Sequence, residues 1–197
     1  MEANKIIEFL EELGKLKLLP RTGWLMRGVR SPESVADHSF RVIAISMVLA
    51  DALKERGMTV DVERVMRLAI MHDWAETLTT DLPHVTHSLF SKGAVERAEA
   101  RAFDHLILPL GAIGQHYKTL WQEYEARTSL EARIVKAADL IELMLQACEY
   151  EKQGIRNLED FWERELNLNE LVDDELLGAL AEHLRRSHTD ITEQSKF

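Results

Sequence analysis

Four ionisable side chains fall on helix faces that are otherwise apolar, and these residues are the ones best suited to chemistry. His38 lies in one apolar stripe of 3,4 spacing, and His72 ends another and is followed directly by Asp73. Asp139 lies within the apolar run of residues 134–141. A lone histidine on such a face is more often a hydrogen-bonded core residue than a ligand. A shared divalent cation, however, would neutralise both carboxylates and use both imidazoles, so the set predicts a metal centre.

Two further acids follow the His-Asp pair closely. Glu76 is four residues after His72, which places it over the same helical surface, and Asp81 follows in the next loop. Paired acids beside a metal suit hydrolysis, because one can direct or deprotonate water while the other handles the leaving oxygen. The alternative is that both acids lie at a solvated helix end.

The elements that must position these residues are predicted to be helices, because only 9 glycines and 4 prolines interrupt long periodic segments. Residues 20–32 and 77–92 are expected to be loops. The first expected helix has apolar residues at 6, 10, 13 and 16. The second starts at Ser31-Pro32-Glu33 and runs to about 56, and the third is capped by Asp61 and continues through His72. Further helices are expected over about 94–108, 115–126, 130–151, 158–166 and 173–186. The fold class is therefore all-α, with roughly seven to nine helices.

Composition excludes several classes of protein. A length of 197 residues predicts one domain, with a metal-site core over about 31–150 and helices over 157–187 that pack on it. The net charge of −10 disfavours binding to nucleic-acid polymers, and 46% apolar residues exclude disorder. We see no secretory signal and no apolar run of about 20 residues that could cross a membrane. The single cysteine, Cys148, fits a reducing compartment, so we expect a soluble cytoplasmic protein.

The spacing His…His-Asp…Asp resembles the signature of the HD superfamily of metal-dependent phosphohydrolases. Within that superfamily, further stretches resemble the 5′-deoxynucleotidase branch, which comprises YfbR-like proteins and related HD domain-containing proteins. These stretches are PRTGW at 20–24, ESVADH at 33–38, HDWAE at 72–76, TDLP at 80–83 and VKAAD at 135–139. The resemblance covers most of residues 1 to about 150 and implies an all-α HD-domain fold.

The resemblance also implies roles for individual residues. The metal ligands would be His38, His72, Asp73 and Asp139. Glu76 would position or activate the attacking water, and Asp81 would assist the proton transfers. Arg21 would bind the phosphate, for which its planar guanidinium is well suited, and Trp24 would pack by the nucleoside. In the bacterial enzymes the arginine and the tryptophan are adjacent, whereas Thr22 and Gly23 separate them here, so Trp24 could equally be a loop aromatic that covers the edge of the core.

The implied activity is the hydrolysis of deoxyribonucleoside 5′-monophosphates to deoxyribonucleoside and phosphate. It would use one divalent cation, which the sequence leaves open among cobalt, manganese, iron, nickel, zinc and magnesium. The alternatives are another HD phosphohydrolase, acting on a pyrophosphate, a cyclic nucleotide or another phosphomonoester, or a helical module with a structural metal. The resemblance further implies a homodimer. His84 and His87 are expected at the substrate edge or in solvent rather than at a second metal.

Overall fold

The computed structural model describes residues 2–162 and 167–194, and all regular elements within these ranges are helices. This confirms the predicted all-α class. The elements in chain order are α1 (Ala3–Leu13), η1 (Gly14–Lys17), α2 (Thr22–Leu25), α3 (Val35–Glu55), α4 (Val62–Met71), α5 (Glu76–Thr79), α6 (His84–His87), α7 (Ala94–Ile107), η2 (Leu108–Leu110), α8 (Ala112–Ala126), α9 (Leu130–Lys152), α10 (Glu159–Trp162), α11 (Leu168–Leu171) and α12 (Glu175–Gln194).

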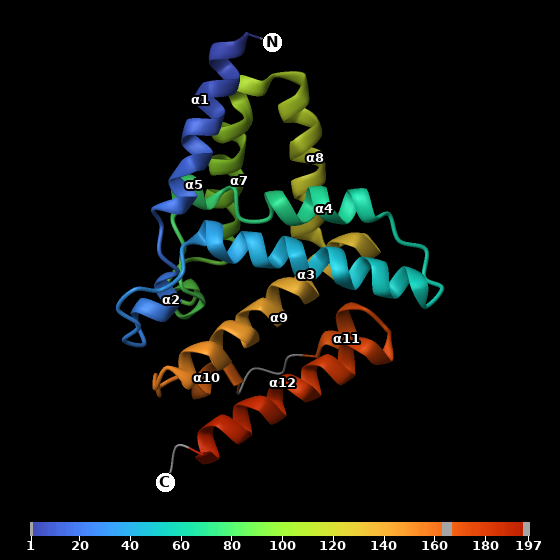
Figure 1. The fold of residues 1–197 in the computed structure, drawn as a ribbon. Coiled ribbons are helices and arrows are strands. Elements are labelled where there is room, and N and C mark those ends of the chain that lie inside the picture. Colours follow the sequence, from blue (N-terminus) through green and yellow to red (C-terminus); the bar gives the residue numbers. More distant parts are fainter. Residues whose placement is uncertain (1, 163–166, 195–197) are drawn as a thin grey trace.

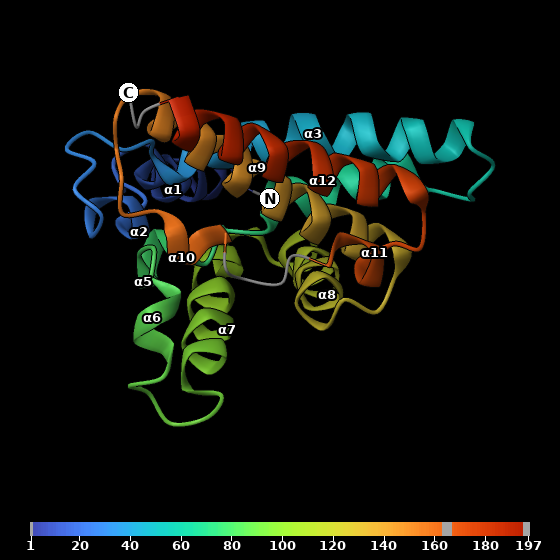
Figure 2. The same ribbon diagram turned by 90° about the horizontal axis from the view of Figure 1, so that it is seen from below.

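The helices that carry the candidate ligands are stacked across the molecule. In Figure 1, α3 lies between α4 and α9, and α12 covers the other side of α9. Helices α1, α7 and α8 stand steeply to this layer, and α8 packs on both α4 and α9. Figure 2 shows the short helices α5 and α6 beside α7, on the same side of the long helices. The candidate site therefore lies where long helices meet short segments.

Helix α3 begins at Val35, three residues later than Pro32, where the sequence analysis placed its first helical residue. The Ser34 side chain accepts a hydrogen bond from the Asp37 backbone N–H, and the Asp37 side chain accepts one from the Ser34 backbone N–H. This capping box makes Ser34 the N-cap, so the prediction of Ser31 as the cap is wrong. The backbone N–H of Glu33 is instead bonded to the Tyr150 hydroxyl of α9.

Other helix starts follow the predicted chemistry. The Asp61 side chain accepts a bond from the backbone N–H of Arg64 at the start of α4, as expected for a cap. Ser129 caps α9 in the same way. Helix α8 begins three residues before the predicted position 115, directly after Gly111, whose φ of 57° permits the turn that follows η2.

Short helices account for most of the remaining differences. The seven helices of ten or more residues match the lower end of the predicted seven to nine, and one-turn helices add to that number within the described ranges. Two of these short helices, α5 and α6, fall in the predicted loop 77–92. The predicted helix 158–166 is described only as α10, and its residues 163–166 lie outside the described part of the chain.

A continuous apolar core joins the long helices. It contains fully buried residues of α3, α4, α7, α9 and α12, among them Leu53, Leu68, Phe103, Ile134 and Leu177. A smaller apolar cluster surrounds Trp24 and Tyr150, and Cys148 is buried, as expected for a small hydrophobic side chain. None of the helices searched in the described ranges is long and apolar enough to span a membrane.

Candidate metal centre

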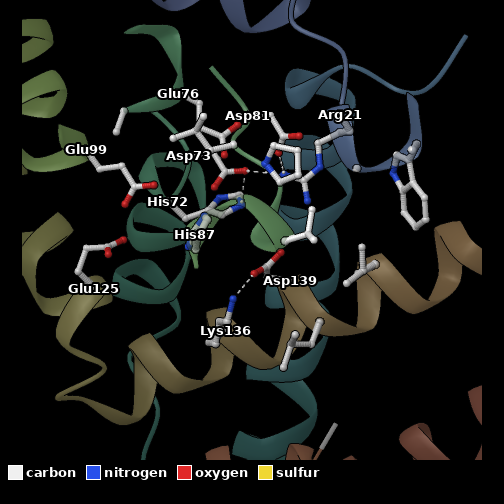
Figure 3. A pocket seen from close by; sticks show the side chains of 18 of the residues that line it. Arg21, His72, Asp73, Glu76, Asp81, His87, Glu99, Glu125, Lys136 and Asp139 are labelled. Carbon is white, nitrogen blue, oxygen red and sulfur yellow. Dashed lines mark hydrogen bonds and ion pairs between the residues drawn. The ribbon is translucent and has the colours of Figure 1, made fainter. Parts of the chain in front are cut away.

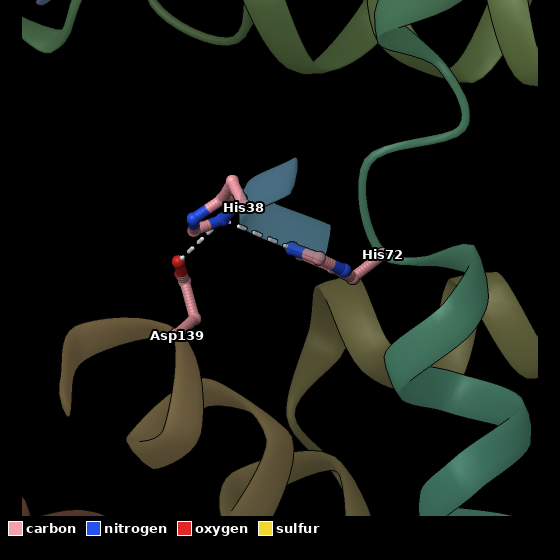
Figure 4. Close-up of side chains that lie close together, drawn as sticks. All are labelled: His38, His72 and Asp139. Carbon is pink, nitrogen blue, oxygen red and sulfur yellow. Dashed lines mark hydrogen bonds and ion pairs between the residues drawn. The ribbon is translucent and has the colours of Figure 1, made fainter. Parts of the chain in front are cut away.

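Side chains from three long helices converge at one point. His38 projects from α3, His72 follows the last residue of α4, and Asp139 projects from α9 (Figure 4). The Nε2 atoms of the two histidines are 3.4 Å apart, and His38 Nε2 lies 3.3 Å from Asp139 Oδ1. These three residues each offer a ligand atom within 4.8 Å of the others, a spacing that allows all three to share one cation.

Asp73, the fourth expected ligand, lies against the same two imidazoles. Its Oδ2 is 3.1 Å from His72 Nε2 and 3.5 Å from His38 Nε2. This oxygen is buried and accepts no hydrogen bond of acceptable geometry, so nothing within the described residues fully satisfies it. The structure therefore brings all four predicted ligand residues together, around a place where a buried carboxylate oxygen lacks a donor.

The donor set fits a divalent metal ion. The Nδ1 atom of His72 lies 2.7 Å from the backbone carbonyl of Ala69, and the Nδ1 atom of His38 lies 2.6 Å from a carboxylate oxygen of Glu142. When Nδ1 carries the proton and donates it to such an acceptor, the lone pair of Nε2 is left for a metal. Two imidazole nitrogens and two carboxylates form a mixed set of the kind that first-row divalent cations accept.

The electrostatics of the cluster favour positive charge at its centre. Burial and Arg21 oppose a charge on His38, but hydrogen bonds to Asp139 and Glu142 outweigh them and raise its pKa to about 9. Burial alone would raise the pKa of Asp73, yet the charges of His72, His38 and Arg21 hold it below the ordinary value. Acceptors that stabilise a proton here would also stabilise a cation.

The surroundings of Glu76, in contrast to those of Asp73, disfavour the charged form of its carboxyl group. Glu76 is the first residue of α5, and its Oε2 is buried without a hydrogen-bond partner. Burial and the negative charge of Asp73 raise the pKa of Glu76 well above its usual value. A carboxyl group with a raised pKa is a stronger base when it is ionised, which favours a part in proton transfer.

Arg21 and Asp81 form a second polar unit at the cavity. Arg21 Nη1 donates to Asp81 Oδ1 at 2.8 Å, and the Thr22 backbone N–H donates to Asp81 Oδ2 at 2.6 Å. Arg21 also lies 3.9 Å from Asp73 Oδ2, so its guanidinium reaches toward the metal centre (Figure 3). Burial opposes the charge of Arg21, but Asp81 and Asp73 overcome that effect and raise its pKa further. Both oxygens of Asp81 are engaged in holding Arg21 and the start of α2, and its expected part in proton transfer stays a prediction.

Trp24 is packed more deeply than a typical substrate contact. Only 1% of its surface is exposed, its ring stacks on Phe161 at a centroid distance of 4.5 Å, and its Nε1 donates to Glu33. Trp24 therefore packs within the smaller apolar cluster, and it lies in α2 rather than in the loop that the sequence alternative described. It also lines the cavity, so a contact with substrate stays a prediction.

One cavity of about 270 Å³ is lined by seven of the eight predicted site residues, all except His38. Leu140, Leu143 and Phe161 give it an apolar part, while Glu99 and Glu125 face it from α7 and α8 (Figure 3). His87 also lines the cavity, whereas the side chain of His84 lies outside what the structure describes. Lys136 lines the cavity too and donates to Asp139 at 2.7 Å.

Sequence reasoning missed the charged residues behind and beside the ligands. Glu142 is completely buried next to His38, and it bonds to Arg41. Glu142 lies in the same apolar helix face as Asp139, three residues further along, so the signal that singled out Asp139 was present for it as well. Glu99 and Glu125 gave no such signal, because they stand among polar neighbours in helices that look amphipathic.

A buried His-Asp cluster between the helices of an all-α protein is the arrangement expected from the resemblance to the HD superfamily. A family model described as HD domain matches residues 13–174, and the chain belongs to the HD-domain family. The chain is 37% identical over 167 residues to the 5′-deoxynucleotidase HDDC2 of Homo sapiens, covering 82% of this chain and 76% of that protein. It is 34% identical to HDDC2 of Xenopus laevis, covering 94% of both chains.

A solved structure shares the fold of this chain. A conserved hypothetical protein from Pyrococcus furiosus is 40% identical to this chain, with a TM-score of 0.81, covering 91% of this chain and 99% of that one. The predicted family is therefore confirmed, both as the HD domain and as the group that contains the HDDC2 5′-deoxynucleotidases.

Proposed function

We propose that this protein is a metal-dependent phosphomonoesterase that hydrolyses deoxyribonucleoside 5′-monophosphates to deoxyribonucleoside and phosphate. The observation that carries the proposal is that Arg21 and Glu76 line one cavity together with three of the four proposed ligand residues, His72, Asp73 and Asp139. The fourth, His38, has its Nε2 within 3.5 Å of both aspartates. The relatives named HDDC2 are 5′-deoxynucleotidases, which supports this substrate class for a chain with 34–37% identity to them. Water adds to phosphorus and the bond from phosphorus to the 5′-oxygen breaks.

One divalent cation would be held by His38, His72, Asp73 and Asp139. When bound, it supplies a Lewis acid that lowers the pKa of water and offsets the charge of the phosphoryl oxygens. Cobalt, manganese, iron, nickel, zinc and magnesium are all compatible with the mixed nitrogen and oxygen ligands.

The remaining roles belong to groups whose surroundings suit them. Arg21, with its charge maintained by Asp81 and Asp73, would bind a phosphoryl oxygen and offset the charge that develops there. Glu76, whose raised pKa makes its ionised carboxylate a stronger base, would accept a proton from the attacking water. We assign Asp81 mainly to holding Arg21 in place. The proton taken from the attacking water must finally be transferred to the departing 5′-oxygen. Trp24 would meet the nucleoside only through the part of its ring that lines the cavity.

The proposal also covers the domain organisation, the cellular compartment and the oligomeric state of the enzyme. The packing of α12 on α9 supports treating residues 1–197 as one HD domain. A buried lone cysteine is compatible with the cytoplasm, and the family resemblance supports a homodimer.

A panel of phosphate-release assays tests this function. Purified protein is stripped of metal and then supplied separately with cobalt, manganese, magnesium or zinc. Each form is offered deoxyribonucleoside and ribonucleoside 5′-monophosphates, with inorganic phosphate as the measured product. A cyclic nucleotide and a nucleotide pyrophosphate are tested beside them by chromatography of the products, because their hydrolysis need not release inorganic phosphate. We expect phosphate release from the deoxyribonucleotides in the presence of metal only. Turnover restricted to the cyclic or pyrophosphate compounds would favour another HD phosphohydrolase. Metal-dependent melting without any turnover would favour a structural metal.

A further inference from the structure

A completely buried carboxylate lies directly behind His38. Glu142 of α9 has no exposed surface, and its Oε2 is 2.6 Å from His38 Nδ1. One helical turn earlier on α9, Asp139 places Oδ1 3.3 Å from the other ring nitrogen, Nε2. The His38 imidazole is therefore held between two carboxylates of one helix, one on the cation side and one behind it.

Arg41 holds Glu142 in this place. It is three residues after His38 on α3, and its Nε and Nη2 donate to Glu142 Oε1 at 2.9 and 2.7 Å. The same guanidinium donates to Gln146 and, from Nη1, to Glu149 at 2.8 Å. Burial alone would raise the pKa of Glu142, but His38 and Arg41 lower it below the ordinary value. One oxygen of Glu142 thus faces Arg41 while the other is left for the imidazole.

The second histidine has a different support. His72 Nδ1 faces the neutral backbone carbonyl of Ala69 at 2.7 Å. Either acceptor fixes the proton on Nδ1 and so directs the Nε2 lone pair at the cation. A carboxylate does more, because its negative charge makes the imidazole a stronger donor to a metal.

We propose that Glu142 is a positioning residue of the metal centre, which fixes the tautomer and orientation of His38 and strengthens its bond to a divalent cation. This inference rests on the proposed role of His38 as a ligand. The competing role is purely structural, in which Glu142 and Arg41 only join α3 to α9. Both roles predict that loss of Glu142 lowers thermal stability, so metal affinity is the measurement that separates them.

Glu142→Gln is the main test, because it keeps the size and an acceptor oxygen but removes the charge. Glu149→Gln is the matched control: it is the same substitution on the same helix, and it removes the charge of a half-exposed partner of Arg41. Metal-stripped proteins are titrated with Co²⁺ by calorimetry. We expect Glu142→Gln to bind Co²⁺ about 10- to 100-fold more weakly than the unchanged protein. Glu149→Gln should stay within about twofold, because exposed pairs contribute little.

Activity gives a second readout. The Co²⁺ concentration for half-maximal phosphate release should rise by the same factor in Glu142→Gln, and excess Co²⁺ should restore most of the rate. Equal Co²⁺ affinity in the two Gln variants would overturn the positioning role. If Glu142→Gln does not fold, Glu142→Asp keeps the charge but withdraws it from Nδ1, and an affinity equal to that of the unchanged protein would likewise overturn the proposal. Failure of the unchanged protein to bind any metal would overturn the metal-dependent function itself. Metal binding without turnover would refute only the phosphatase activity.

Discussion

The cavity has two walls that are built in different ways. The helix wall carries His72 and Asp139, and the fully buried His38 lies against Asp139. These three residues lie on or at the ends of α3, α4 and α9, helices of 10 to 23 residues. The loop wall carries Arg21, Glu76 and Asp81 on or beside helices of four residues. Apolar packing between long helices fixes the first wall. Hydrogen bonds between short segments, such as Arg21 to Asp81, fix the second.

The difference in construction accompanies a difference in charge. On the helix wall, Lys136 and the histidines keep the pKa of Asp139 well below its usual value despite burial, so this wall is suited to holding a cation. On the loop wall, burial and Asp73 raise the pKa of Glu76, so this wall is suited to proton transfer. Substitutions in the two walls should therefore fail differently, the first through metal and the second through turnover or substrate binding.

Loss of a ligand should have the largest effect. In Asp73→Ala, we expect both Co²⁺ binding and phosphate release to disappear, with a decrease in rate on the order of 10⁴-fold, because the Lewis acid contributes several kcal/mol. Calorimetry and phosphate release measure the two losses. Asp104→Ala, which removes a half-exposed partner of Lys118, is the control and should retain both properties. An Asp73→Ala protein that binds Co²⁺ like the unchanged protein would remove Asp73 from the ligand set.

Substitution of Glu76 on the loop wall should impair turnover without impairing metal binding. We expect Glu76→Gln to bind Co²⁺ normally while its kcat falls on the order of 10³-fold, because the amide keeps the shape of the side chain but cannot accept the proton. The same two assays apply, with the exposed Glu96→Gln on α7 as the control. Full activity in Glu76→Gln would exclude the assigned role, and loss of Co²⁺ binding would place Glu76 on the metal instead.

A conservative change at Arg21 should act mainly on substrate binding. Lysine keeps the charge but cannot form two parallel bonds, so we expect Arg21→Lys to raise KM about 10- to 100-fold. Steady-state kinetics measure this change, and Arg64→Lys, which affects an ion pair outside the cavity lining, is the control. An unchanged KM would mean that the guanidinium does not contact the phosphate and serves only to join Asp81 to α2.

The helix wall was more open to prediction from sequence than the loop wall. Apolar periodicity located the long helices, and His38, His72 and Asp139 stood out because they broke that periodicity. Glu142 carried the same signal, but its partner Arg41 comes from another helix, and periodicity does not report which helices meet. The loop wall depends on bonds between segments about 60 residues apart, such as Arg21 to Asp81, which local spacing cannot show. For that wall, local spacing had singled out Glu76 and Asp81, and the family resemblance alone pointed to Arg21.

The N-cap of α3 offers a direct test, because the structure and the sequence analysis place it at different residues. Ser34→Ala should lower the free energy of unfolding by about 1 kcal/mol, because it removes the side chain that caps the helix. Ser31→Ala, at the cap position that the sequence predicted, should leave stability within about 0.5 kcal/mol. Urea unfolding of the metal-stripped proteins measures both values. A larger loss for Ser31→Ala than for Ser34→Ala would contradict the capping box.

The smallest expected effect concerns Glu99, which faces the cavity from α7 beyond either wall. Burial and the charge of Asp73 raise its pKa from 4.5 to about 7, so between these values the folded state binds more protons than the unfolded state. The stability that this group contributes is present below about pH 4.5 and lost as the pH rises through 7. Glu99→Gln should therefore gain up to about 1 kcal/mol relative to the unchanged protein between pH 6 and pH 8, a value reduced by solvent screening. Urea unfolding of both metal-stripped proteins at the two pH values measures this difference. Because Asp73 is one cause of the shift, the gain should shrink in an Asp73→Ala background, and an undiminished gain would assign the shift to burial and the charge of Glu96.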